Sequence, residues 1–155
     1  MITRFIKNQL LSDLRPNHVT SLFGARRAGK TFLMNELINE IGSEKVMQVQ
    51  GDDLDMADLF SSQRLSVLKN AVKGHKWLFI DEAQKIPNIG NSLKLIVDSI
   101  PDLGIFITGS SALDLSEKTA EPLTGRSNYY YLYPFTQVEL GQNMIEANQL
   151  LSDKL

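Results

Sequence analysis

The chain has 155 residues, enough for one domain, and its 18 acidic and 16 basic side chains give a formal net charge of −2. Because the chain contains no cysteine, a disulfide scaffold, a cysteine-ligated metal site and a thiol nucleophile are excluded. With two histidines in the chain, a histidine-rich metal site is not expected either. The charge balance provides no global basic field for nucleic acid, and no apolar run is long enough for a membrane span or a signal peptide. We therefore expect a single cytoplasmic domain over residues 1–155 that makes no contact with a membrane.

Strand-like and helix-like patterns alternate along the chain. In chain order they predict a helix at 4–14, a strand at 19–23, a helix at 29–41, a strand at 45–50, a helix at 54–72, a strand at 76–80, a helix at 91–100, strands at 105–108 and 129–133, and a helix at 136–155. Most of the strands are continuous apolar runs, which is typical of a parallel sheet covered by helices on both faces. The predicted fold is a three-layer α/β/α sandwich with a mainly parallel sheet of about five strands, in which ligands bind beyond the carboxyl ends of the strands.

The strongest motif runs from Gly24 to Thr31 and fits G-x-x-x-x-G-K-[ST], the phosphate-binding P-loop. Its two glycines permit backbone angles at which successive N–H groups face an anion, at the positive end of the following helix. We expect Lys30 to reach the β- and γ-phosphates and the Thr31 hydroxyl to coordinate Mg²⁺. The predicted nucleotide-binding residues are Gly24, Ala25, Arg26, Arg27, Ala28, Gly29, Lys30, Thr31 and Phe32.

Asp81 and Glu82 follow four apolar residues at the end of the predicted strand 76–80. Behind a P-loop this arrangement is typical of a Walker B strand, in which Asp81 would hold Mg²⁺ through water and Glu82 would orient and polarise the attacking water. Taken alone, an acidic pair after a strand is just as often the solvated start of a helix. Together the two motifs indicate binding of a nucleoside triphosphate with Mg²⁺.

Three further residues are candidates for contacts with the γ-phosphate. Thr108 is the first choice and Ser110 the second, because both lie at the tip of the strand 105–108; the alternative is a strand-to-helix turn capped by Ser110 or Ser111. Arg126 precedes the last strand, and we expect it on the nucleotide side of the sheet, supplying a cation in cis or in trans. The alternative for Arg126 is a solvated surface charge.

Tyrosines cluster near the end of the last predicted strand. Tyr129, Tyr130, Tyr131 and Tyr133 make this segment aromatic enough for base stacking. At strand spacing next to Pro134, however, the pattern favours packing within the sheet.

The motifs occur in an order that resembles one protein family. They are LFGARRAGKT at 22–31, WLFIDEAQKIP at 77–87, ITGSS at 107–111, LTGR at 123–126 and YPFT at 133–136. The sequence resembles, over about residues 4–140, the AAA-like P-loop ATPases of bacteria and archaea that usually carry a second, C-terminal domain of unknown function. The resemblance implies the division of these ATPases that has an additional strand and a catalytic glutamate, with the sheet order 5-1-4-3-2.

The resemblance also implies roles for individual residues. Lys30, Thr31, Asp81 and Glu82 fall on the Walker positions of the family, Arg26 on an arginine usual in its P-loop, and Arg126 on its Gly-Arg position after the sensor strand. The implied function is Mg²⁺-dependent ATP binding and hydrolysis, coupled to conformational change in an appended domain or a partner. The helix at 136–155 would then lead into that second domain.

Two other functions remain open at this stage. One is a nucleotide-binding switch that acts as an interaction module without turnover. The other is a small-molecule P-loop kinase, although such enzymes often use a strand-end aspartate without an adjacent glutamate. Beyond ATP, we expect a homo-oligomer or a partner protein. Nucleic acid is weakly supported, because the sequence shows no helix-turn-helix signature and no basic stripe.

Overall fold

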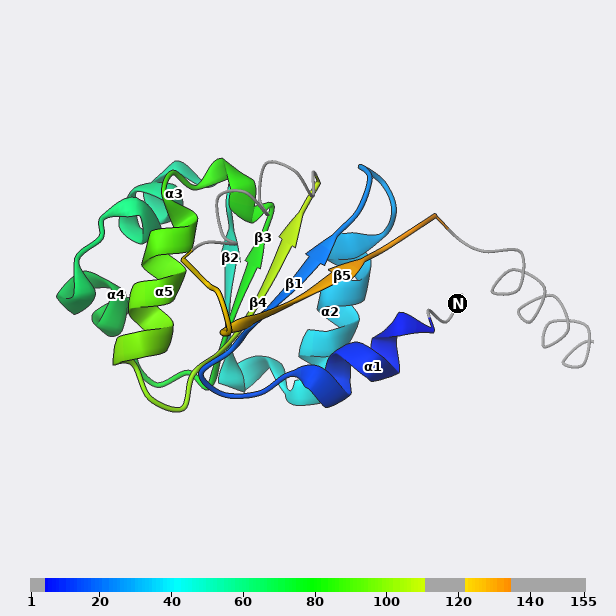
Figure 1. Ribbon diagram of the computed structural model, residues 1–155, viewed down its shortest axis with the longest axis horizontal. Coiled ribbons are helices and arrows are strands. Elements are labelled where there is room, and N and C mark those ends of the chain that lie inside the picture. The colour runs from blue at the N-terminus through cyan, green and yellow to red at the C-terminus, as the bar shows by residue number, and fades with distance from the viewer. Residues whose placement is uncertain (1–4, 111–121, 135–155) are drawn as a thin grey trace, which may run out of the picture.

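In a computed structural model that describes residues 5–110 and 122–134, a five-stranded sheet lies between two layers of helices (Figure 1). The strands are β1 (Val19–Phe23), β2 (Val46–Gln50), β3 (Trp77–Asp81), β4 (Gly104–Gly109) and β5 (Ser127–Tyr131). The helices are α1 (Ile6–Asp13), α2 (Lys30–Ile41), α3 (Leu54–Ser61), α4 (Leu65–Ala71) and α5 (Ile89–Ser99), with short 3-10 turns at Ser43–Lys45 and Ala83–Lys85. The predicted three-layer sandwich is confirmed, whereas Ser111 and the predicted helix 136–155 lie outside the described residues.

All neighbouring strands are parallel, in the order β2-β3-β4-β1-β5. Counted from the other edge, this is the order 5-1-4-3-2 that the family resemblance implies. Strand β4 lies between β1 and β3, so Phe23 at the end of β1 is aligned with Gly109, and Ile80 near the end of β3 with Ile107. The carboxyl ends of these three strands therefore meet at one edge of the sheet.

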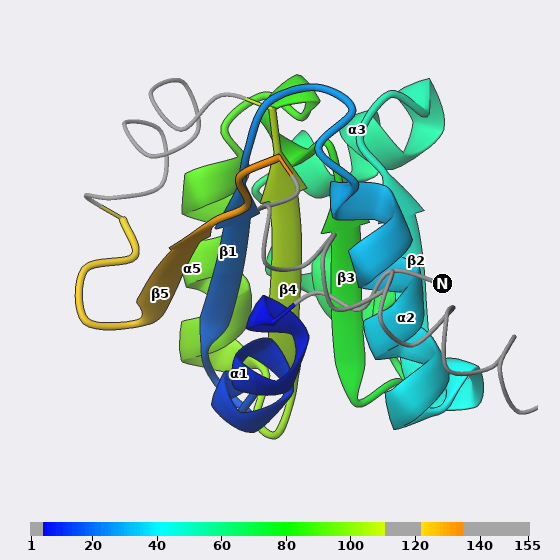
Figure 2. The ribbon, with the colours of Figure 1, turned by 90° about the vertical axis from the view of Figure 1, so that its right-hand side faces the viewer.

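Each face of the sheet has its own hydrophobic core, because successive strand residues point to opposite faces. On one face Phe79 and Phe106 pack ring against ring, with centroids 5.0 Å apart, under α1 and α2. On the other face Ile80 and Ile107 pack beneath α3, α4 and α5. Figure 2 shows α1 and α2 in front of the sheet and α5 behind it. These strands are buried on both faces, which explains why their sequences are continuous apolar runs.

The single helix predicted for residues 54–72 is wrong, since two helices, α3 and α4, occupy this stretch. The break lies at Gln63, whose φ of 56° is left-handed and cannot continue a helix. The Gln63 side-chain amide donates to the Ser92 hydroxyl at 2.8 Å and to the Asn88 carbonyl at 3.3 Å. The turn is thus held by residues on and beside α5.

Other predicted boundaries differ by a few residues. The helix predicted at 91–100 begins at Ile89, and the strand predicted at 129–133 is β5, two residues earlier. Among the described residues the longest helix is α2, with 12 residues. Within residues 5–110 and 122–134, no helix has the length and apolar character needed to cross a membrane.

Candidate functional site

The loop between β1 and α2 depends on its two motif glycines for different reasons. At Gly24 a Cβ atom would lie 2.5 Å from the carbonyl oxygen of Leu132, so only glycine allows the loop to pass this backbone. Gly29 has a φ of 96°, a left-handed conformation, and stands directly before α2. Arg27 also has a positive φ, of 64°. The chain therefore curls tightly before the helix begins, as the P-loop motif predicts.

Lys30 lies inside this loop and is almost fully buried, with 5% of its surface exposed. Its Nζ donates to the carbonyl oxygens of Gly24 at 2.9 Å and Ala25 at 3.0 Å. Burial lowers the pKa of Lys30, and the charge of Arg26 lowers it further, while Glu82 and Asp81 act in the opposite direction. The ammonium group is therefore held among backbone carbonyls, where an anion in the loop would be its natural partner.

Asp81 joins the P-loop side of the site to the neighbouring strands. Its Oδ2 accepts a hydrogen bond of 2.7 Å from the hydroxyl of Thr31 at the start of α2. Its Oδ1 accepts a second hydrogen bond from the hydroxyl of Thr108 at the end of β4. The aspartate itself ends β3 and is 3% exposed. Three motifs separated by 27 to 50 residues in the sequence thus meet at one carboxylate.

Thr108, which we expected to contact the γ-phosphate or water, makes two hydrogen bonds within the protein. It is fully buried, and besides donating to Asp81 its hydroxyl accepts from the backbone N–H of Glu82 at 3.0 Å. The single hydroxyl proton is therefore already used. Thr108 supports the turn that follows β3. Ser110, the second choice, is half-buried and accepts a hydrogen bond of 2.9 Å from the Gln84 side chain.

Glu82 occupies a constrained turn directly after β3. Its φ of 52° and ψ of 47° are left-handed, a conformation that non-glycine residues rarely adopt. Gly51, at the end of β2, packs against this turn: a Cβ there would lie 2.3 Å from the Glu82 carbonyl oxygen, and its N–H donates to the Asp81 carbonyl at 2.8 Å. The Glu82 carboxylate accepts a hydrogen bond from Gln84. Our interpretation of the sequence missed Gly51 and Gln84, although both stand within two residues of a predicted site or strand end.

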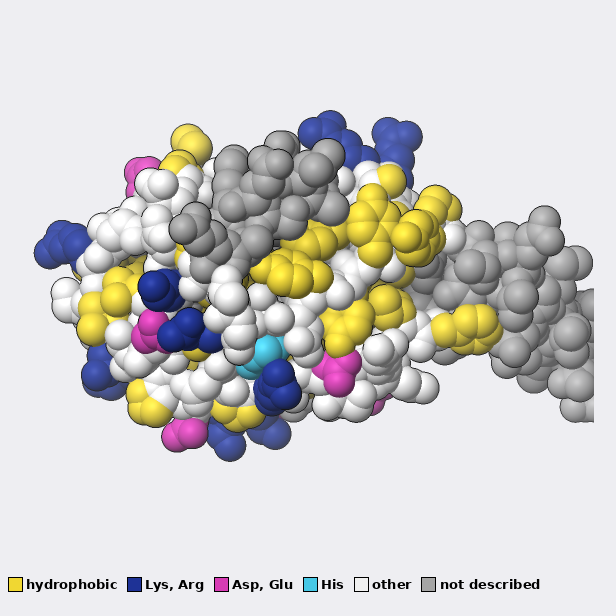
Figure 3. Space-filling view, in the orientation of Figure 1, with side chains coloured by type: hydrophobic (Ala, Val, Ile, Leu, Met, Phe, Trp, Pro, Cys, Tyr) yellow, Lys and Arg dark blue, Asp and Glu magenta, His cyan; other side chains and the backbone are white. Residues whose placement is uncertain are grey.

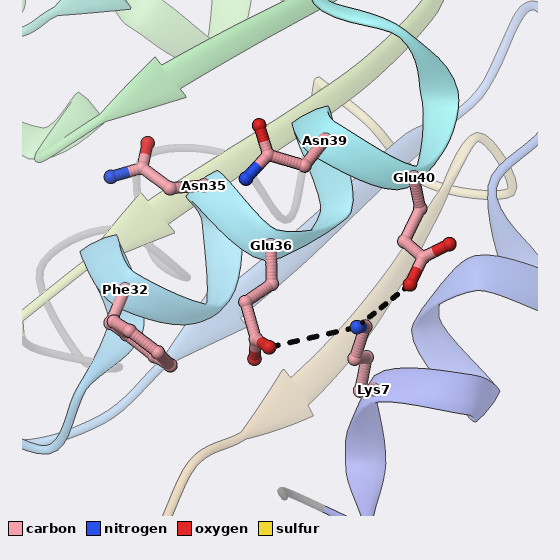
Figure 4. A pocket seen from close by; sticks show the side chains of 6 residues that line it. All are labelled: Lys7, Phe32, Asn35, Glu36, Asn39 and Glu40. Atoms are coloured by element: carbon pink, nitrogen blue, oxygen red, sulfur yellow. Dashed lines mark hydrogen bonds and ion pairs between the residues drawn. The ribbon is translucent and has the colours of Figure 1, made fainter. Parts of the chain in front are cut away.

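The side chains at the outer end of the P-loop point into different surroundings. Arg26 and Arg27 are exposed at the loop. Phe32 is 48% exposed and lines a hollow of about 260 Å³ between α1 and α2 (Figure 4). The other lining residues are Lys7, Asn35, Glu36, Asn39 and Glu40, and Lys7 pairs with Glu40 at 3.0 Å and Glu36 at 3.6 Å. Two carboxylates make this hollow unsuitable for phosphate, so a nucleotide contact from Phe32 would have to come from its backbone.

Arg126 lies at the edge of the sheet opposite the P-loop, contrary to our expectation. Its carbonyl accepts from the N–H of Val19, the first residue of β1, at 2.9 Å. The P-loop begins after Phe23, the last residue of β1, about 13 Å away along the strand. The guanidinium Nε of Arg126 instead pairs with Asp98 of α5 at 2.7 Å. Because β5 is parallel to β1, the residue before it must lie at the amino edge.

Comparison with known proteins places this arrangement in a family. The profile of the AAA domain family matches residues 16–141. The chain belongs to the AAA domain family. An uncharacterized protein of Methanocaldococcus jannaschii is 31% identical to this AAA domain over 126 residues, which are 80% of the chain and 28% of that relative. The chain therefore spans less than a third of the curated relative.

Solved structures with the same fold include ATPases and AAA proteins. The Walker-type ATPase Paby2304 of Pyrococcus abyssi aligns with 96% of this AAA domain and 59% of its own chain, at a TM-score of 0.65 and 17% identity. A structure describing katanin self-assembly aligns with 86% of the domain and 51% of its own chain, at a TM-score of 0.58 and 15% identity. At these identities the likeness shows the fold. Family and fold together support nucleotide binding and hydrolysis as the general function of this domain.

Proposed function

We propose that this AAA domain binds ATP with Mg²⁺ between the P-loop and the ends of β3 and β4, and hydrolyses it with Glu82 as the residue that orients and polarises water. The observation that carries the proposal is the double hydrogen bonding of Asp81 by Thr31 and Thr108. These hydrogen bonds place the P-loop, which carries Lys30, close enough to the end of β3 for one ligand to contact both. Such convergence is the arrangement that phosphoryl transfer requires, since it depends on positioning and charge stabilisation.

The donor atoms near Thr31 suit Mg²⁺. The Thr31 hydroxyl and Asp81 Oδ2 are oxygens 2.7 Å apart, and Mg²⁺ prefers oxygen ligands supplied by one or two carboxylates, phosphates and water. Bound there, Mg²⁺ would supply charge neutralisation to the β- and γ-phosphates.

The chain's own residues would divide the remaining tasks. Lys30 would exchange the Gly24 and Ala25 carbonyls for phosphate oxygens, and the loop N–H groups would receive the rest of the phosphate chain. Glu82 would accept a hydrogen bond from the attacking water and help to remove its proton as the terminal phosphorus–oxygen bond breaks. Thr108, through the Glu82 N–H, would keep the start of this turn in place.

The proposal includes coupling to a neighbour. ATP binding would drive conformational change in an appended domain or a partner protein, and assembly with further copies of the chain is the simplest way to complete the site. Arg126 lies at the amino edge of the sheet, so its proposed action on the γ-phosphate is in trans, on the nucleotide of an adjacent copy. The similar katanin structure is described as one of self-assembly, which supports oligomerisation as the first state to examine.

The deciding experiment is steady-state ATP hydrolysis with Mg²⁺, measured per chain across a range of protein concentrations. We expect Lys30→Ala to lose nucleotide binding, and Glu82→Gln to retain binding while turnover falls by about 10²- to 10⁴-fold, the usual contribution of a general base. Glu44→Gln, an exposed change in the turn Ser43–Lys45, is the matched control and should behave as wild type. A Glu82→Gln variant that hydrolyses at the wild-type rate would contradict the catalytic assignment.

The other two functions give different results in the same assay. Tight ATP binding without turnover at any concentration would identify a nucleotide-dependent switch. ADP release that depends on a small-molecule acceptor would identify a kinase. The Asp81-Glu82 pair favours hydrolysis, because the second carboxylate is the group that a hydrolase needs for water.

A further inference from the structure

The end of β5 runs beside the start of the P-loop. Tyr131, the last residue of β5, is aligned with Phe23, the last residue of β1. The next residue, Leu132, donates its N–H to the Phe23 carbonyl at 2.7 Å, and its own carbonyl lies against Gly24. Residues 131–133 therefore border the loop that is proposed to hold phosphates.

Two aromatic rings of this segment face outward. Tyr131 is 44% exposed and Tyr133 is 66% exposed, and their ring centroids are 4.9 Å apart with the planes at 42°. Tyr130, which precedes them in β5, points to the opposite face, where its hydroxyl donates to Asp13. Figure 3 shows hydrophobic side chains gathered over β5. The rings are more exposed than sheet packing requires, since the packing of this segment is carried by Tyr130 and the buried Leu132.

The order of the strands fixes the direction in which a bound nucleotide would lie. The groups proposed to hold Mg²⁺ and the terminal phosphate, Asp81 and Glu82, follow β3, and Thr108 ends β4. In the sheet, β4 is on one side of β1 and β5 is on the other. Neighbouring strands are about 4.8 Å apart, so the end of β5 is roughly 10 Å from the end of β4. A triphosphate that starts at β4 and follows the P-loop over β1 therefore carries its base toward β5.

We propose that Tyr131 and Tyr133 form a wall of the nucleobase site, on which the purine of the bound nucleoside triphosphate stacks. The inference rests on the proposed function and extends it from the phosphates to the base. Stacking on an aromatic ring suits any purine, because every base presents a π-face. The site should therefore raise the affinity for adenine and guanine nucleotides alike over that for inorganic polyphosphate.

The test compares two ligands that share the phosphate chain but differ in the base. Calorimetric titration of the full chain uses a non-hydrolysable ATP analogue and inorganic tripolyphosphate, each with Mg²⁺. In Tyr131→Ala and Tyr133→Ala, the affinity for the ATP analogue should fall by about 5- to 100-fold, the usual loss for one stacked base. The affinity for tripolyphosphate should stay unchanged. The phenylalanine variants at both positions retain the ring and should bind as wild type.

A matched control and a direct contact measurement complete the experiment. Tyr129→Ala removes a ring that lies two residues further from the P-loop and stacks on Phe23 at 5.8 Å; the ratio of the two affinities should not change in this variant. Nuclear Overhauser contacts between adenine protons and the rings of Tyr131 or Tyr133 should appear in the bound wild type.

The outcomes separate this inference from the proposed function. If the wild type binds neither ligand, the proposed function and the nucleobase site are both wrong. If the alanine variants lose the two ligands to the same extent, or lose neither, the base does not stack on these rings, while phosphate binding by the P-loop stands.

Discussion

The side-chain amide of Gln84 donates a hydrogen bond to the carboxylate of Glu82. The same nitrogen also donates to the hydroxyl of Ser110, just after β4, at 2.9 Å. The amide oxygen of Gln84 is buried and finds no partner among the residues that the structure describes. Gln84 thus links the proposed catalytic carboxylate of Glu82 to Ser110 after β4. Within residues 5–110 and 122–134, the amide oxygen of Gln84 is an unpaired hydrogen-bond acceptor on the same side chain.

This contact predicts that Gln84 positions Glu82 for its reaction. In Gln84→Ala we expect the kcat of ATP hydrolysis to fall by about 10- to 150-fold, because a hydrogen bond to a charged group is worth about 1.5–3 kcal/mol. Nucleotide affinity should stay within about twofold of wild type, since the Gln84 amide bonds to Glu82 and Ser110, which lie outside the P-loop. Steady-state kinetics and equilibrium titration of an ATP analogue measure the two quantities.

A neighbouring change serves as the control for Gln84. Lys85→Ala removes an exposed ion pair with Asp52, whose atoms are 3.6 Å apart, and should leave both kcat and affinity unchanged. If Gln84→Ala hydrolyses ATP faster than wild type, the amide restrains Glu82 instead of placing it productively, and the positioning role is wrong.

Thr108 provides a prediction about stability and activity together. Thr108→Val leaves a buried Asp81 oxygen and the Glu82 N–H without their partner, so the free energy of unfolding should fall by about 1–3 kcal/mol. Turnover should fall as well, because the turn that carries Glu82 loses its support. Thr108→Ser keeps the hydroxyl and should retain most of both. Urea unfolding and steady-state hydrolysis are the measurements.

β1 offers a matched control for the threonine change. The hydroxyl of Thr20 is also buried in a central strand, but it has no hydrogen-bond partner within the described ranges. Thr20→Val should therefore be neutral or stabilising, because it removes an unpaired polar group of the same shape. Equal losses of stability in Thr20→Val and Thr108→Val would show that the hydrogen bonds of Thr108 do not contribute to the free energy of unfolding.

The central strands could be predicted closely from the sequence, and the elements at the periphery less well. β1, β3 and β4 are buried on both faces, so their apolar runs are unambiguous. β5 is half-exposed along its length, and its tyrosines led us to place it two residues too late. The break at Gln63 depends on hydrogen bonds from side chains and carbonyls that are 25 and 29 residues away, which periodicity in one segment cannot reveal.

The site divides in a similar way. Lys30, Thr31, Asp81 and Glu82 belong to local motifs, so their placement at one edge of the sheet followed from strand direction. The partners of Thr108 depend on how β3 and β4 are aligned, and this register is a property of the folded sheet. The error at Arg126 was one of direction, because a residue that precedes a parallel strand lies at the amino edge.

His18 makes stability depend on pH. It is buried at the start of β1, and burial lowers its pKa below the ordinary value of 6.5, assisted by the charge of Arg15 and opposed by Asn128 and Asp13. Below pH 6.5 the unfolded chain therefore takes up a proton that the folded chain resists. The free energy of unfolding should fall as the pH drops from 6.5 to the folded pKa of His18, and this contribution should be constant below it.

Urea unfolding from about pH 8 to about pH 5 measures this effect. His18→Gln removes the group, so the curve of this variant should be flatter below pH 6.5 than that of wild type. Parallel curves for wild type and His18→Gln would mean that burial of His18 does not contribute to acid sensitivity.

Arg126 should matter for turnover between copies more than for folding. Its ion pair with Asp98 is about 40% exposed on both sides, and such pairs contribute about 0.2–1 kcal/mol. If Arg126 acts on a neighbour's nucleotide, turnover per chain should rise with protein concentration, and Arg126→Ala should lose that rise, since arginines in this role are worth about 10³–10⁵ in rate. Asp98→Asn breaks the same ion pair but keeps the arginine, so it should share the small loss of stability and keep the rise. A turnover that does not depend on concentration in the wild type, or an equal loss of rate in both variants, would argue against action in trans.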